Sequence, residues 1–94
     1  MNSHTGIQCD RNCQIDGSIV SENGKYGIYI KSGSVIGSTI ANNTKEGIYD
    51  DNIDDKMIVG IGDNLLLANN KAHPGQETFG RVVKLLPNAC ASPC

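Results

Sequence analysis

An acidic run lies near the middle of the chain. It contains Asp50, Asp51, Asn52, Asp54 and Asp55, and Lys56 follows it directly. Hard oxygen ligands that are clustered in this way suit Ca²⁺. The run starts with the spacing of an EF-hand loop but lacks that loop's turn glycine and its bidentate glutamate. Two interpretations therefore stay open: a solvated acidic loop, or a calcium site formed by Asp50, Asp51, Asp54 and Asp55.

Two tyrosines, Tyr29 and Tyr49, occupy equivalent places in two consecutive copies of a sequence repeat. Gln8 falls in the same column one repeat earlier, and the next column holds Asp10, Lys31 and Asp51. Rings about 5 Å apart beside hydrogen-bonding groups are suited to stacking against sugars. Outward aromatic columns also stabilise sheets without binding a ligand. The sequence thus predicts either a structural face or a glycan-binding face of Gln8, Tyr29, Lys31, Tyr49 and Asp51.

The four cysteines form a C-x3-C pair near each end of the chain, Cys9 with Cys13 and Cys90 with Cys94. They allow three pairings: two local loops, or two arrangements that tie the tail to the first repeat. A zinc site would need all four thiolates to converge, and C-x3-C differs from the usual C-x2-C knuckle. Free or buried thiols are the third alternative. Disulfides are the favoured interpretation, and they agree with an oxidising compartment.

These residues must be positioned by a repeat that covers Gly17–Ile30 and Gly37–Asp50. The two segments read GSIVSENGKYGIYI and GSTIANNTKEGIYD and align without a gap, and Gly6-Ile7 starts the pattern one repeat before Gly27. A period of about 20 residues is typical of a solenoid. The apolar runs are short and β-branched and alternate with period 2, so each turn of the coil, or rung, is expected to consist of strands.

The repeat also predicts which side chains fill the coil. Three columns should point inward: Ile7, Ile28 and Ile48; Ile15 and Val35; Val20 and Ile40. Asn23 and Asn43 should stack at a tight turn, because Asn tolerates the left-handed conformation and stacked amides bond to one another. Ser18 and Ser38 belong to another turn.

The succession G-I-x-I, S-V-I-G-S-T-I-A-N-N and a second G-I resembles repeats of the pectate-lyase-like superfamily, over roughly Gly6–Ala72. The likeness is closest to the bacterial carbohydrate-binding and sugar-hydrolase type. It implies an all-β fold: a right-handed parallel β-helix (solenoid) of about three rungs, each of roughly 20 residues, with a C-terminal cap. Enzymes of this superfamily hold calcium on acidic side chains and abstract a sugar proton with a base, which would be Lys56 or Arg81 here. Other members are not enzymes.

The chain should form one domain, residues 1–94, with rungs over 6–72 and a capping segment with a Cys-bearing tail over 73–94. A buried carboxylate is costly, so the chain is expected to leave the coil at Tyr49 or Asp50. In the degenerate last repeat, Leu67 matches either Ile40 or Val35, and we favour Val35. Residues 76–86 form either a helix or, as we favour, a strand over the open end of the coil.

The composition narrows the classes of function. A formal net charge of −2 argues against nucleic acid as a partner, and no apolar run is long enough to span a membrane. No triad is evident, since only His4 and His73 are available and G-x-S-x-G is missing. No signal peptide precedes the first rung, which suggests the C-terminal part of a larger protein, extracellular or periplasmic.

The expected function is a non-catalytic β-helix module, structural or glycan-binding, with polysaccharide as the partner and no cofactor. One alternative is a calcium-dependent polysaccharide lyase or epimerase, or its accessory module. The other is a structural module that self-associates into a homo-oligomer through the open end of the coil, where unpaired strand edges invite pairing.

Overall fold

The computed structural model is an all-β coil, and it describes residues 3–51, 58–71, 73, 76–80 and 82–90. This part of the chain contains strands and turns and no helix. The strands are β1 (Ile7–Cys9), β2 (Cys13–Asp16), β3 (Ile19–Ser21), β4 (Ile28–Ile30), β5 (Gly33–Ile36), β6 (Thr39–Ala41), β7 (Ile48–Asp50), β8 (Val59–Gly62), β9 (Leu65–Leu67), β10 (Thr78–Phe79), β11 (Val82–Lys84) and β12 (Ala89–Cys90).

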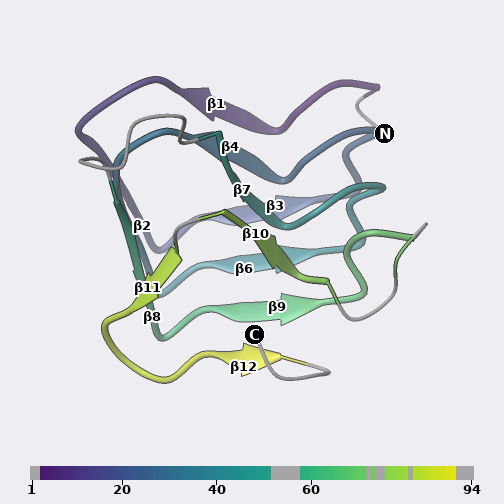
Figure 1. Ribbon diagram of the computed structural model, residues 1–94. Helices are drawn as coiled ribbons and strands as arrows, with labels where there is room; N and C mark the ends of the chain where they lie inside the picture. Colours follow the sequence, from purple (N-terminus) through teal and green to yellow (C-terminus); the bar gives the residue numbers. More distant parts are fainter. Residues whose placement is uncertain (1–2, 52–57, 72, 74–75, 81, 91–94) are drawn as a thin grey trace.

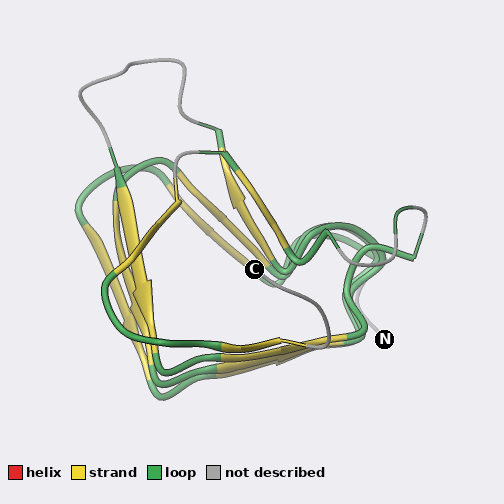
Figure 2. Cartoon of the chain, turned by 60° about the horizontal axis from the view of Figure 1, so that its bottom comes forward, coloured by secondary structure: helices red, strands yellow, loops and turns green. Residues whose placement is uncertain are grey.

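The strands stack as three parallel sheets. Their orders are β1-β4-β7-β10, β2-β5-β8-β11 and β3-β6-β9-β12, so each rung gives one strand to each sheet (Figure 1). Figure 2 looks nearly along the stack, and the rungs there lie over one another around a three-sided interior. The predicted parallel β-helix of about three turns is therefore confirmed.

The predicted inward columns are confirmed by the strand register. Ile28 pairs with Ile7 and Ile48, Ile15 pairs with Val35, and Val20 pairs with Ile40. The members from the middle rungs are fully buried. Each such Ile or Val side chain contributes roughly 1.5–3 kcal/mol through burial, so the columns account for much of the core.

The register of the last repeat differs from both predicted matches of Leu67. Leu66 pairs with Ile40 and Ile61 pairs with Val35, whereas Leu67 pairs with Ala41 and points outward. Paired residues are 26 positions apart in the sequence here and 20 positions apart in the preceding rung. The longer connection between β7 and β8 shifts the numbering, and an alignment at constant spacing cannot detect this.

An amide ladder runs through the interior turn that precedes the first sheet. Asn23 Nδ2 donates to Asn43 Oδ1 at 2.8 Å, and Asn43 Nδ2 donates to Asn69 Oδ1 at 2.7 Å. All three side chains are buried. The predicted stacking of Asn23 and Asn43 is confirmed. The left-handed residue, however, is the one before each ladder Asn, such as Asn42 with φ 55°.

Glu77 ends this ladder. The preceding rungs have glycine at the position of Glu77, because a Cβ there would collide with the amide ladder. At Gly47, for example, it would lie 2.8 Å from Asn69 Nδ2. On the last rung no further Asn follows, and the buried Glu77 side chain fills the space. Its Oε1 accepts from Asn69 Nδ2 at 2.7 Å, which satisfies the last amide donor.

A second ladder lies at the turn before the third sheet, where Ser18 and Ser38 were expected. Ser38 Oγ accepts from Ser18 N at 3.1 Å, and Asn64 Oδ1 accepts from Ser38 N at 2.9 Å. Asn64 Nδ2 then donates to Asn88 Oδ1 at 3.0 Å. Both turns are therefore held by side chains that bond from rung to rung.

The segment expected as a strand over the open end forms strands, as favoured over a helix, but these strands stack on the coil as a further rung. β10, β11 and β12 pair with β7, β8 and β9, so these last strands extend all three sheets. Lys84 occupies the column of Ile61 and is exposed. The tail beyond Cys90 lies outside the described residues.

Asp50 corrects the predicted exit from the coil. It belongs to β7, pairs with Ile30 and is only 2% exposed. The backbone ladder continues to this point because Asp51 N still donates to Ile30 O at 3.2 Å. Gly80, with φ 98°, passes so close that a Cβ there would lie 2.7 Å from Asp50 Cβ. The chain thus leaves the coil after Asp50, and this side chain stays inside.

Asn43→Ala tests the amide ladder. It removes the acceptor of Asn23 Nδ2 and the donor to Asn69 Oδ1, so we expect a loss of about 2–4 kcal/mol in the free energy of unfolding. Urea denaturation followed by circular dichroism measures it. The matched control is Asn42→Ala, which should cost about 1 kcal/mol or less, because Ala68 holds the same backbone conformation on the next rung. Equal losses in both variants would refute the ladder's role.

Candidate functional site

All four aromatic residues of the chain gather in one cluster outside the first sheet. Strand register puts three of them in one column that begins with Gln8 on the first rung: Tyr29, Tyr49 and Phe79. The Tyr29 and Tyr49 ring centroids are 5.4 Å apart at 17°, and those of Tyr49 and Phe79 are 4.9 Å apart at 7°. The rings stack face to face because parallel strands repeat at about 4.8 Å.

Tyr26 flanks this column from the turn before β4. Its ring centroid lies 4.3 Å from that of Tyr49 and 5.7 Å from that of Tyr29. Lys45 Nζ lies 5.3 Å from the centre of the Tyr26 ring, within the range of a cation–π contact. Burial, followed by the neighbouring Tyr49, raises the pKa of the Tyr26 phenol.

Tyr29 is fixed at its hydroxyl by Asp51. The phenol O–H donates to Asp51 Oδ2. This hydrogen bond, followed by burial and the charge of Asp51, raises the pKa of Tyr29 to about 12. Asp51 follows β7 directly, so a residue of the third rung holds the Tyr29 ring of the second rung. Two residues of the predicted glycan face are thereby joined in one contact.

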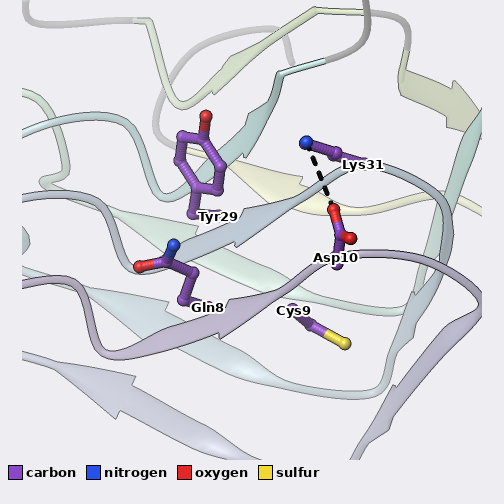
Figure 3. A pocket seen from close by; sticks show the side chains of 5 residues that line it. All are labelled: Gln8, Cys9, Asp10, Tyr29 and Lys31. Atoms are coloured by element: carbon purple, nitrogen blue, oxygen red, sulfur yellow. Dashed lines mark ion pairs between the residues drawn. The ribbon is translucent and has the colours of Figure 1, made fainter.

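A depression of about 420 Å³ opens at the N-terminal end of the aromatic column, beside Tyr29. It is lined by Gln8, Cys9, Asp10, Tyr29 and Lys31 (Figure 3). Lys31 Nζ lies 3.2 Å from Asp10 Oδ1, and both side chains keep access to solvent. All five residues belong to the first two rungs, so the depression lies on the side of Tyr29 away from Tyr49.

A disulfide between Cys9 and Cys13 closes the corner beside the depression. Asp10 lies within the loop that this bond closes. The expectation of disulfides is confirmed for this pair, and among the three pairings that the sequence left open the structure has the local one for Cys9 and Cys13. This bond is consistent with an oxidising, extracellular setting. Cys90 is also disulfide-bonded, and Cys94 lies outside the described residues.

The predicted calcium ligands are not assembled in the part of the chain that the structure describes. Asp50 is buried in the coil, and Asp51 accepts from Tyr29. Asp54, Asp55 and the candidate bases Lys56 and Arg81 all lie outside the described residues, so calcium binding stays a prediction. Within the described ranges, no three His, Cys, Asp or Glu side chains are placed to hold a metal ion.

The structure brings together all five residues of the predicted glycan face. Gln8, Tyr29 and Lys31 line the depression, Tyr49 covers Tyr29, and Asp51 orients it. Phe79 was not predicted from the sequence, because the longer third rung and the turn that follows it break the constant spacing that links Tyr29 to Tyr49. Tyr26 was not predicted either, because it lies in a turn where strand alternation gives no direction.

No protein-family model matches this sequence, and neither a curated protein nor a solved structure matches it. The resemblance to the pectate-lyase-like superfamily therefore stays a prediction beyond the coil itself. The described residues include no helix with the length and apolar character needed to cross a membrane.

Alkaline titration tests the contact between Tyr29 and Asp51. The unfolded chain ionises its tyrosines near pH 10, whereas the pKa of Tyr29 in the folded protein is about 12. The contact's contribution to stability is thus fully present below about pH 10 and is lost as the pH rises from about 10 to 12. The ultraviolet absorbance of ionised tyrosine should show a phenol that ionises near pH 12, and Asp51→Asn should move that ionisation to lower pH. Identical curves for both proteins would contradict the contact.

Proposed function

We propose that this chain is a non-catalytic glycan-binding module. The observation that carries the proposal is the concentration of every aromatic side chain in one outward cluster that ends at a polar depression. Sugars combine an apolar C–H face with hydroxyl edges, and aromatic rings beside charged groups complement both. A purely structural column would stabilise the sheet equally well without the polar depression.

Only the ends of a stacked column present a ring face. Tyr49 covers one face of Tyr29, and Phe79 stacks on the other side of Tyr49. The depression borders Tyr29 where the column ends, since Gln8 is not aromatic. Tyr29 is therefore the ring against which a sugar would stack, with Gln8, Asp10 and Lys31 as hydrogen-bonding neighbours.

The same proposal includes the architecture and the compartment. We infer a right-handed coil of the pectate-lyase-like type, since connections between parallel strands are right-handed in nearly all proteins. We also infer that the module belongs to a secreted protein, extracellular or periplasmic. The support for this is the Cys9–Cys13 disulfide, because such bonds persist in oxidising compartments.

Binding of oligosaccharides to immobilised protein tests the proposal. Tyr29→Ala should weaken binding about tenfold or more, because loss of a stacking ring costs on the order of 1.5 kcal/mol. Phe79→Ala is the matched control, since this ring is 51% exposed but lies at the far end of the column. Binding should persist in EDTA, in contrast to a calcium-dependent lyase.

Two results would overturn the proposal. One is the failure of the wild-type protein to bind any neutral or acidic oligosaccharide. The other is equal loss of affinity in Tyr29→Ala and Phe79→Ala, which would indicate that the column acts only on the sheet. Circular dichroism of both variants checks that the coil is intact.

A further inference from the structure

We propose that the depression binds one uncharged sugar ring through two adjacent hydroxyls, and that this ring stacks against Tyr29 at the end of the aromatic column, beside Gln8. The inference rests on the proposed function and names the ligand class of that site. It follows from three properties of the depression: its position in the column, its ion pair and its charge.

The position follows from strand register. Gln8, Tyr29, Tyr49 and Phe79 occupy the same column on four successive rungs, with Gln8 on the first. The rings above Gln8 are stacked at 5.4 and 4.9 Å. A sugar ring that packs against Tyr29 where it borders the depression would continue this stack by one member. The volume of about 420 Å³ is at the lower end for ligand sites, roughly 300–1,000 Å³, which suits a ligand as small as one sugar ring.

The ion pair supplies a matched acceptor and donor. Lys31 Nζ and Asp10 Oδ1 lie 3.2 Å apart, and their side chains are 34% and 73% exposed. A carboxylate only accepts hydrogen bonds and an ammonium only donates them, whereas a hydroxyl does both. One hydroxyl can thus donate to Asp10 while its neighbour on the same sugar ring accepts from Lys31. Figure 3 shows this pair on one side of the depression and Gln8 and Tyr29 on the other.

The charge of the site disfavours acidic sugars. Among the described residues that line the depression, Lys31 is the one cation, and Asp10 already neutralises it. Asp51, at the Tyr29 hydroxyl, adds a second carboxylate next to the stacking ring. A uronic acid would bring a further negative charge to this group, and like charges at short range repel. The depression therefore selects neutral rings.

The test compares matched sugars by isothermal titration calorimetry. Tetrasaccharides of glucose, mannose and galactose are titrated against their uronic acid counterparts of the same linkage. We expect binding of at least one neutral member and about tenfold weaker binding of its uronic acid counterpart at low salt. An analogue of that neutral sugar that lacks one of two adjacent hydroxyls should bind roughly fivefold more weakly.

Asp10→Asn should lower the affinity for the neutral sugar and reduce its preference over the uronate. Asp16→Asn is the matched control, because Asp16 is an exposed carboxylate on β2 that does not line the depression. It should leave both affinities unchanged. Equal effects of the two variants would overturn the assignment of the ion pair.

The outcomes separate this inference from the proposed function. Binding of uronates as tight as or tighter than that of neutral sugars, with loss in Tyr29→Ala, would overturn the ligand class and leave a glycan-binding module. Full affinity for the deoxy analogues would overturn recognition of adjacent hydroxyls. Absence of binding to every sugar would overturn both.

Discussion

Each rung of this protein forms its backbone hydrogen bonds with the rungs above and below it. The sheets are parallel and in register, so a residue on one rung stands about 4.8 Å from the equivalent residue on the next. Every position in the repeat thus becomes a column along the coil, and each side chain must fit against the side chains at the same position on the neighbouring rungs. Ile and Val fill the inward columns, Asn and Ser hold two turns, and glycine leaves room beside Asn.

The candidate site lies on the outer face of the coil and results from the same in-register stacking of rungs. Columns bring Tyr29, Tyr49 and Phe79 together although these residues come from three different rungs. The stacked rings need no loop to position them, since the spacing between rungs fixes the distance between the rings. The depression arises where a column changes residue type, at Gln8, and the Cys9–Cys13 disulfide closes the adjoining corner.

The sequence predicted those parts of the molecule in which the repeat keeps its period. The coil, the columns of Ile28 and Val35, and the stacking of Tyr29 on Tyr49 all follow from a constant repeat length. Prediction failed where that length changes. The register of Leu66 and the place of Phe79 were missed because the third rung is longer.

Asp50 shows a different limit of sequence reasoning. Its charge predicted an exposed position, but strand pairing continues through it and keeps it inside. Burial preferences describe single side chains, whereas parallel pairing acts on the whole strand. Glu77 illustrates the same point: a glutamate is rarely buried, and only the neighbouring Asn69 amide explains its place. Such residues cannot be recognised until their neighbours on other rungs are known.

The amide ladder has a direction. In the bonds between side chains, from Asn23 to Asn43, Asn69 and Glu77, each Nδ2 donates toward the C-terminal end, and the Asn64–Asn88 pair has the same sense. The bonds to backbone carbonyls, such as Asn69 Nδ2 to Ile40 O, run toward the preceding rung. A carboxylate, which cannot donate while ionised, can close such a series only at the end that needs an acceptor. The two ends of the coil are therefore chemically different, like the two ends of a polar filament. A further rung beyond Glu77 would require glycine at the position of Glu77 and a new asparagine that supplies the next amide donor. Glu77 alone therefore sets the length of the ladder.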